Sequence, residues 1–152
     1  MNKLSIIIPA YNEEKTIAKV LDKVLNQNFS GWEKEIIVVN DASKDTTEEK
    51  VGPFLDKIKY LKHSRNQGKG AAIRSGIESM TGDAMVVQDA DLEYDPADIQ
   101  KLLGELGDRK DLVIYGSRNL HPERRGYSHY VLGSKVMDWL VNLFFGTCLT
   151  DV

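Results

Sequence analysis

The sequence predicts an α/β fold in which helices cover both faces of a mainly parallel central sheet, and three observations support this. Short apolar runs rich in β-branched residues recur along the chain without alternation of apolar and polar positions, as expected of strands buried on both faces. Segments with helical spacing separate these runs. Polar residues gather where the runs end, which is the edge at which open parallel sheets bind ligands.

The first half of the chain predicts three strands and two helices. Strands are expected at 4–8 and 36–39, and a shorter one at 59–61. The apolar residues of the first helix follow the spacing i, i+3, i+4, i+7 and i+8, namely Ile17, Val20, Leu21, Val24 and Leu25. A short helix follows the second strand, and Ser43 or Asp45 would cap its N-terminus.

The second half continues the alternation. Residues 68–80 are expected to form a helix that begins with small residues, and 84–88 a buried strand. Pro96 suits the first turn of the next helix, whose apolar stripe is Ile99, Leu102, Leu103 and Leu106. Beyond it, a strand, a long loop and a broadly apolar helix are expected in turn at 112–115, 116–130 and 131–145.

Composition restricts the class of protein. A chain of 152 residues with 41% hydrophobic content has the size of one domain with one core. The formal net charge is −3, whereas sequence-independent nucleic-acid binding needs a large basic surface, so no nucleic-acid partner is expected. The single cysteine, Cys148, excludes an internal disulfide and favours a reducing compartment. No apolar run reaches the roughly 18–20 residues that span a bilayer, so a cytoplasmic protein is expected.

The candidate site lies at the carboxyl ends of four predicted strands. The first strand leads into residues 9–13, the second into Asp41, the fourth into 89–93 and the fifth into 116–118. Each group alone is explained by turn chemistry, because Asp, Asn, Gly and Pro are favoured in turns. Their convergence on one edge of the sheet favours a binding site.

Asp89 and Asp91 form an Asp-x-Asp pair on the segment that leaves the fourth strand. Two carboxylates at this spacing are able to face one hard cation, and Glu93 adds a third at the same spacing. Mg²⁺ or Mn²⁺ held there would bridge a diphosphate and stabilise it as a leaving group. The alternative is an exposed acidic turn, which the pair taken by itself favours.

Two further segments each have two interpretations. Asp41 is equally suited to accept hydrogen bonds from a nucleobase and to cap the following helix. Residues 66–70 (Asn-Gln-Gly-Lys-Gly) are similar to a phosphate-binding glycine loop at a helix start, although they lack the spacing of a P-loop or a dinucleotide fingerprint. The alternative is a flexible turn before a helix that requires small residues for close packing.

Basic residues cluster in or beside the long loop, namely Arg118, Arg124, Arg125 and Lys135. Arginine pairs well with phosphate oxygens, so the cluster suits an anionic substrate. The alternative is a solvated basic loop. The three histidines lack metal-ligand spacing, and no role is assigned to His63, His121 or His129.

Five segments, taken in order and spacing, resemble the family 2 glycosyltransferases, which have the GT-A fold. They are 6–13 (IIIPAYNE), 38–45 (VVNDASKD), 66–72 (NQGKGAA), 89–96 (DADLEYDP) and 116–118 (GSR). The resemblance covers essentially the whole chain and implies the Rossmann-like fold of nucleotide-diphospho-sugar transferases. Within the family, the last two segments are most similar to those of dolichyl- or polyprenyl-phosphate mannosyl- and glucosyltransferases.

The resemblance also implies roles for individual residues. The nucleotide pocket would be lined by Pro9, Tyr11, Asn12, Glu13, Asp41 and Lys69. The metal and the diphosphate would lie between Asp89, Asp91 and Glu93, and the donor and acceptor phosphates would face Arg118 and Arg125. Asp91 and Arg118 are the catalytic candidates, although Asp91 is equally suited to be a metal ligand alone. Asn40 stands where many members carry a second Asp, so the nucleobase contacts are expected to differ.

The implied reaction moves mannose or glucose, with inversion, from a nucleotide-diphosphate sugar (GDP-mannose or UDP-glucose) to a dolichyl or polyprenyl phosphate. Mg²⁺ or Mn²⁺ is the implied cofactor. A lipid phosphate is already anionic, so metal and arginines would suffice without a strong general base. The alternatives are a polysaccharide or other sugar acceptor, and a nucleotide-sugar-binding fragment without turnover.

Residues 1–152 are expected to form a catalytic domain truncated at its C-terminus, because the family pattern continues beyond Asp151. Helix 131–145 would pack against the absent part or lie on a membrane surface. Packing is favoured because the polar face of this helix is not rich in Lys or Arg. Peripheral association with the cytoplasmic face of a membrane stays open, and the oligomeric state is not predicted.

Overall fold

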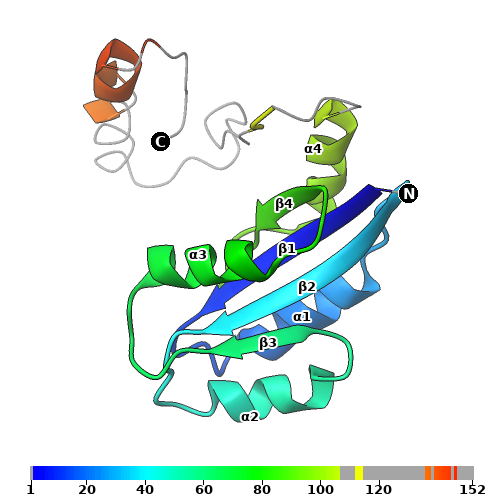
Figure 1. Cartoon of the computed structure of the whole chain (residues 1–152), viewed down its shortest axis with the longest axis vertical. Coiled ribbons are helices and arrows are strands. Elements are labelled where there is room, and N and C mark those ends of the chain that lie inside the picture. The colour runs from blue at the N-terminus through cyan, green and yellow to red at the C-terminus, as the bar shows by residue number, and fades with distance from the viewer. Residues whose placement is uncertain (1, 107–111, 115–135, 138, 145, 147–152) are drawn as a thin grey trace. The chain divides into compact units, whose positions relative to one another are not determined.

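The computed structural model describes residues 2–106, 112–114, 136–137, 139–144 and 146. The chain divides into two units, Met1–Asp111 and Leu112–Val152. The described part of the first unit contains a four-stranded sheet in the order β3-β2-β1-β4, in which every neighbouring pair is parallel (Figure 1). The predicted parallel α/β architecture is thereby confirmed.

Strands and helices alternate along the first unit, as predicted. The strands are β1 (Asn2–Ala10), β2 (Trp32–Asn40), β3 (Lys59–Lys62) and β4 (Ala84–Val87). The helices are α1 (Ile17–Asn26), α2 (Thr47–Val51), α3 (Lys69–Ser79) and α4 (Ile99–Leu106), with short 3-10 turns at Gly52–Phe54 and Pro96–Asp98. Every element predicted before residue 107 is present, with boundaries that differ by a few residues.

The pleat of the strands divides the core into two apolar clusters, one on each face of the sheet. Leu4, Ile6 and Ile8 of β1 pack with the buried stripe of α1, with Val51 of α2 and with two residues of α4. Ile7, which points the other way, packs with residues of β2 and with Ala72 of α3. Figure 1 shows α3 and α1 on opposite faces of the sheet, so both faces are covered, and the central residues of β1 and β2 are buried and mainly apolar.

Gly76 explains how closely α3 approaches the sheet. A Cβ atom at this position would lie 2.5 Å from Cγ2 of Ile7, a separation that no side chain tolerates. A larger residue would push α3 away from β1. Because α3 begins at the carboxyl edge of the sheet, this close packing also fixes the position of its N-terminus.

The amino edge of the sheet is closed by internal polar contacts. The Glu35 carboxylate accepts hydrogen bonds from the Ser5 hydroxyl at 2.6 Å and from the Thr81 backbone amide at 2.9 Å. Lys34 donates to carbonyl oxygens at the end of α1, including that of Gln27 at 2.6 Å, and burial lowers the pKa of its ammonium. The polar groups at this edge bind one another, which leaves the carboxyl edge for ligands.

In the second unit, the predicted strand at 112–115 is not found. Leu112, Val113 and Ile114 are not in a strand, and Val113 is 70% exposed. Tyr115 lies outside the described residues, as does the predicted loop at 116–130. The apolar run alone therefore overpredicted sheet structure.

The described part of the helix predicted at 131–145 is helical, namely 136–137 and 139–144. Its large apolar side chains are exposed, with Trp139 at 62% and Phe144 at 76%. Within the described residues, no helix is long and apolar enough to cross a membrane. Both interpretations of this helix, packing against a further segment or lying on a membrane surface, stay predictions.

Candidate active site

A pocket of about 260 Å³ lies at the carboxyl edge of the sheet, where β1, β2 and β4 end and α3 begins. Predicted site residues line it from four separate segments, namely Pro9, Tyr11, Glu13, Asp41, Lys69, Asp89 and Asp91. Parallel strands place their carboxyl ends side by side, so one pocket collects residues that are distant in the sequence. Asn12 and Glu93 are not among the lining residues.

Asp41 is the most enclosed acidic side chain of this pocket, with 3% of the residue exposed. Its Oδ1 atom accepts a hydrogen bond from Nδ1 of His63 at 2.6 Å and from the backbone amide of Gln67 at 2.9 Å. Its Oδ2 atom accepts from the amide of Gly68 at 2.7 Å and, at 3.1 Å, from that of Gln67. Asp41 therefore joins the end of β2 to the start of α3.

These contacts determine the charge of Asp41. Burial opposes ionisation, but the hydrogen bonds from His63, Gln67 and Gly68 outweigh it, so the pKa of the carboxyl lies below its ordinary value of 3.8. An ionised carboxylate only accepts hydrogen bonds, so Nδ1 of His63 carries a proton and donates it to Asp41.

Of the two interpretations of Asp41, the one in which it caps the following helix is wrong. At the start of α2, it is Oδ1 of Asp45 that accepts a hydrogen bond from the Thr47 amide, at 3.0 Å. Ser43, the other predicted cap, instead accepts a hydrogen bond from the amide of Asn12 at 3.0 Å. Asp41 is therefore left to face the pocket and the loop before α3.

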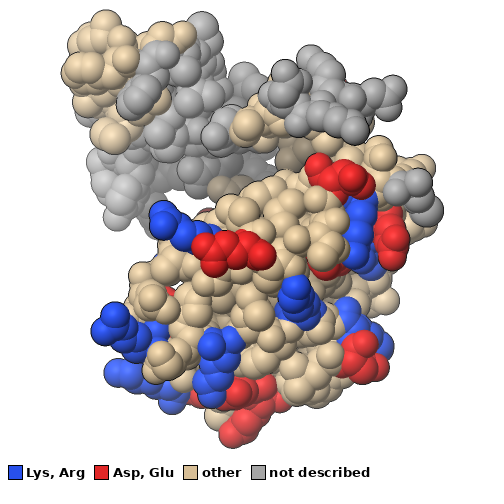
Figure 2. Space-filling model, viewed as in Figure 1, with Lys and Arg blue, Asp and Glu red and all other residues tan. Residues whose placement is uncertain are grey.

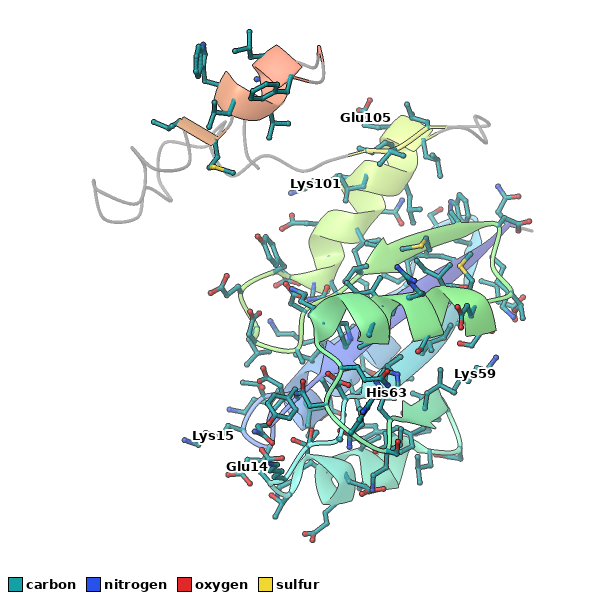
Figure 3. All side chains as sticks on the ribbon, turned by 60° about the vertical axis from the view of Figure 1, so that its left-hand side comes forward. Glu14, Lys15, Lys59, His63, Lys101 and Glu105 are labelled. Carbon is teal, nitrogen blue, oxygen red and sulfur yellow. The ribbon has the colours of Figure 1, made fainter. Side chains whose placement is uncertain are left out.

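His63 was missed by the sequence analysis, which assigned it no role. Its Nδ1 donates to Asp41, and its Nε2 lies 2.9 Å from the hydroxyl of Ser75 on α3. In Figure 3, His63 lies under α3, on the side of β3. The one available signal was its position two residues after the third predicted strand, since residue spacing suggests neither contact.

The glycine-containing segment 66–70 has an internal contact that neither of its interpretations included. Gly68 has φ of +87°, a backbone conformation that side-chain-bearing residues rarely adopt, and it directs its amide at Asp41. The amides of Gln67 and Gly68 are thus already bound to an internal carboxylate, in the way that helix starts bind phosphate. The segment is a fixed turn, and from it Gly68 and Lys69 line the pocket.

The acidic segment after β4 is more open. Asp89 pairs with the ammonium of Lys69, with Nζ to Oδ1 at 2.6 Å, and 25% of its side chain is exposed. Asp91 is exposed, and its Oδ1 accepts the amide of Glu93 at 3.0 Å, a local turn contact. Leu92 between them has φ of +68°, a strained conformation for a residue with a side chain.

Two of the three predicted metal ligands fit a divalent cation. Asp89 and Asp91 both line the pocket, and Mg²⁺ or Mn²⁺ commonly takes one or two carboxylates together with substrate phosphates. Within the described residues, no group of three or more His, Cys, Asp or Glu side chains is arranged to hold a metal. Glu93 therefore does not complete a preassembled three-carboxylate site.

Two asparagines of the predicted site support the loops. Asn12 has φ of +57°, and its side-chain oxygen accepts the amide of Lys44 at 2.8 Å. Asn40 is fully buried, donates to the hydroxyl of Tyr60 at 2.8 Å and accepts the amide of Ser43 at 2.9 Å. Asn40 thus links Tyr60 of β3 to Ser43 in the loop after β2.

A larger and more open hollow, of about 500 Å³, lies on the outer side of the same loops and includes Glu14 and Lys15 (Figure 3). The Glu14 carboxylate accepts the hydroxyl of Thr46 at 2.7 Å, and the Asp45 carboxylate accepts the amide of Glu14 at 3.1 Å. These acidic groups tie two loops together, so the smaller pocket, which holds Asp41, Asp89 and Asp91, is the candidate site.

Charged side chains of both signs lie on the described surface. On the face shown in Figure 2, described Lys and Arg side chains are interspersed with Asp and Glu. The basic cluster predicted at Arg118, Arg124, Arg125 and Lys135 lies outside the described residues. The role of Arg118 and Arg125 therefore stays a prediction.

Residues 5–145 match the model of the family described as Glycosyl transferase family 2. The chain belongs to glycosyltransferase family 2.

Two curated relatives refine the position within the family. The chain is 34% identical over 139 residues to a dolichol-phosphate mannosyltransferase of Pyrococcus furiosus, which covers 90% of this chain and 36% of that protein. It is also 34% identical over 117 residues to the human dolichyl-phosphate beta-glucosyltransferase, covering 70% of this chain and 36% of the relative. The chain thus spans about a third of the length of these relatives.

Solved glycosyltransferase structures share the fold. The mannosyltransferase PcManGT from Pyrobaculum calidifontis, in complex with GDP-Man and Mn²⁺, matches with a TM-score of 0.62 at 25% identity, over 71% of this chain and 33% of that one. Glucosyl-3-phosphoglycerate synthase from Mycobacterium tuberculosis, in a complex that includes Mn²⁺ and UDP, matches with a TM-score of 0.58 at 26% identity. This match covers 69% of this chain and 39% of that one. The fold is the GT-A fold that the resemblance implied.

Proposed function

We propose that this chain carries the donor site of an inverting hexosyltransferase that moves mannose or glucose from a nucleotide-diphosphate sugar to a dolichyl or polyprenyl phosphate. The observation that carries the proposal is the pocket at the carboxyl edge, which gathers Asp41, Lys69, Asp89 and Asp91 from four segments. Relatives with dolichyl-phosphate mannosyl- and glucosyltransferase names support the choice of acceptor.

One side of the pocket suits a nucleoside. Asp41 offers carboxylate oxygens to the polar edge of a base, while Pro9 and Tyr11 offer apolar surface to its rings. Tyr11 is 41% exposed, so its ring is available to a ligand. This side would set the orientation of the donor.

The other side suits a diphosphate. Asp89 and Asp91 would hold Mg²⁺ or Mn²⁺, which neutralises the charge that develops on a diphosphate leaving group. Lys69, now paired with Asp89, is long and exposed enough to turn to a phosphate oxygen. Arg118 and Arg125 are proposed to bind donor and acceptor phosphates as well.

The proposed reaction is a single in-line displacement. An oxygen of the lipid phosphate forms the new bond to the anomeric carbon, the bond from that carbon to the diphosphate breaks, and the nucleoside diphosphate leaves with the bonding electrons. The configuration at the anomeric carbon inverts. The nucleophile is already an anion, so positioning and electrostatic stabilisation carry the catalysis, and Asp91 need not act as a base.

Sugar transfer tests the proposal directly. The full chain is incubated with radiolabelled nucleotide sugar, Mn²⁺ and polyprenyl phosphate in detergent, and the label is partitioned between organic and aqueous phases. Label in the organic phase, absent when Asp89→Ala replaces the wild type, is expected. Label that appears only in a water-soluble glycoside would reject the lipid acceptor.

A binding measurement separates the donor site from the acceptor. Calorimetric titration with UDP-glucose and GDP-mannose, with and without Mn²⁺, is expected to show metal-dependent binding of at least one donor. Absence of metal-dependent binding of both donors would reject the site. The proposed setting is the cytoplasmic face of a membrane, where the lipid phosphate is available.

A further inference from the structure

Most of the hydrogen-bonding capacity of Asp41 is already in use. A carboxylate offers about four lone-pair positions. Oδ1 accepts both His63 and Gln67, and Oδ2 accepts Gly68 at 2.7 Å with Gln67 as a longer second contact at 3.1 Å. The amide of Gln67 is shared between the two oxygens and lies closer to Oδ1, so the carboxylate accepts three donors in all. One further acceptor position therefore stays available, on Oδ2.

His63 keeps Oδ1 occupied. It is held from both sides, by Asp41 at Nδ1 and by the Ser75 hydroxyl at Nε2, and only 11% of its side chain is exposed. Ser75 belongs to α3, which Gly76 holds tightly against β1. The imidazole therefore cannot turn away without breaking both contacts (Figure 3).

Nucleobases differ in the number of donors that they bring to such a carboxylate. Uracil and thymine present one ring N–H between two carbonyl oxygens. Guanine presents a ring N–H beside an exocyclic amino group, so it satisfies both donors only on a carboxylate with two free, adjacent acceptor positions. A donor group that is desolvated without an acceptor weakens binding.

We propose that this pocket selects a nucleoside diphosphate whose base offers a single ring N–H, uracil or thymine, and that His63 is the positioning residue that enforces the selection by occupying Oδ1 of Asp41. The inference rests on the proposed function, because it names the donor class of that same site. Between the donors considered above, it favours UDP-glucose over GDP-mannose.

The first test compares nucleotides that differ in the base. UDP, dTDP and GDP are titrated calorimetrically into the full chain with Mn²⁺ present, and the shared diphosphate makes the base the variable. Binding of UDP at least about tenfold tighter than GDP is expected, the order of effect for one unpaired N–H. The dTDP titration separates recognition of the base from recognition of the ribose, since its base shares the uracil edge.

The second test alters His63. His63→Leu removes the N–H donor and frees a position on Oδ1, so the ratio of GDP to UDP dissociation constants is expected to fall severalfold. His63→Asn is the matched control, because its side-chain amide retains a donor near the position of Nδ1, and it is expected to preserve the ratio. Thermal unfolding and the hydrogen-exchange rate of the Gly68 amide report whether the loop before α3 is intact in each variant.

The outcomes separate the two proposals. Equal or tighter binding of GDP in the wild type would overturn the inference and leave the proposed glycosyltransferase function standing. An unchanged ratio in a folded His63→Leu variant would overturn the role of His63. Absence of binding of every nucleotide with Mn²⁺ present would overturn the proposed function and the inference together.

Discussion

The loops after β2 and after β4 both bring carboxylates to the pocket, but they are built differently. In the first, Asp41 is 3% exposed and accepts hydrogen bonds from residues 22 to 27 positions further along the chain. In the second, Asp91 and Glu93 are exposed, and Asp91 is held by the Glu93 amide two positions away. Long-range contacts fix one loop, and mainly local turn contacts fix the other.

The difference suits the two tasks that we propose for these loops, binding of a nucleobase and binding of a metal with its diphosphate. A base is a rigid planar group, and it is best recognised by acceptors that are already in place. A metal with its diphosphate brings strong charge of its own and is able to draw flexible carboxylates around it. The loop after β2 is therefore preorganised, whereas the loop after β4 is suited to be completed by its ligands.

Removing Asp41 is expected to have the largest effect on stability. Asp41→Ala leaves the amides of Gln67 and Gly68 and the Nδ1–H of His63 without their acceptor, which should cost roughly 2–4 kcal/mol of the free energy of unfolding. Asp91→Ala, the matched change in the open loop, should cost about 0.5 kcal/mol or less. Urea unfolding of both variants checks this, and equal losses would mean that the two loops do not differ.

Acidification should weaken the same loop. The folded-state pKa of Asp41 lies below its ordinary value of 3.8, so its stabilisation is fully present above that value and is lost as the pH falls through the folded pKa. Wild type should therefore lose more unfolding free energy than Asp41→Asn between pH 5 and the acid limit of folding, at about pH 2–3. Parallel pH dependences in the two proteins would contradict this account of Asp41.

Metal-dependent binding should depend on the other loop. Asp89→Ala is expected to weaken donor binding in Mn²⁺ by about tenfold or more, because it removes a proposed metal ligand that lines the pocket. Glu93→Ala, whose side chain does not line the pocket, should change it less than about twofold. Titration of Mn²⁺ with bound nucleotide tests both, and an equal loss in Glu93→Ala would restore the three-carboxylate site.

The turn before α3 offers a comparison between two glycines. Gly68→Ala forces a side chain into φ of +87° and should cost about 1–2 kcal/mol, although no atom lies within 4 Å of the added Cβ. Gly70→Ala, inside α3 and equally unobstructed, should be neutral or should stabilise by up to about 1 kcal/mol. Thermal unfolding measures both, and the prediction is wrong if the two substitutions have the same sign.

The smallest effect concerns the ion pair that joins the loops. Lys69→Met should leave stability within about 0.5 kcal/mol of wild type, because 60% of the lysine side chain is exposed. The substitution should tighten Mn²⁺ binding to the nucleotide-free chain severalfold, because Asp89 loses a competing cation. It should also weaken binding of the nucleoside diphosphate, because a positive charge is removed from the pocket. Lys101→Met, which breaks an exposed pair with Asp98 elsewhere, is the control and should change neither. Weaker Mn²⁺ binding in Lys69→Met would show that Lys69 does not compete for Asp89.

The sequence alone determined much of the fold and most of the predicted residues that line the pocket. The runs at 4–8 and 36–39 place apolar residues on both faces of the pleat, with Ser5 as the one polar residue, and this pattern favours a sheet covered on both sides. Residues directly after such strands must meet at one edge, so Asp41, Asp89 and Asp91 were predictable as neighbours. The same reasoning overpredicted a strand at 112–114, where the described residues are not in a strand.

Only the tertiary structure decided what these residues do to one another. Whether Asp41 caps α2, faces a base or holds the turn before α3 depends on side-chain rotamers and loop paths that residue spacing does not encode. His63 could not be assigned, because both of its partners are brought to it by the packing of α3 on β1. The placement of strands follows from burial, which the recurring apolar runs of the sequence record. Hydrogen bonds across loops depend on distances of a few ångströms, which only the assembled fold establishes.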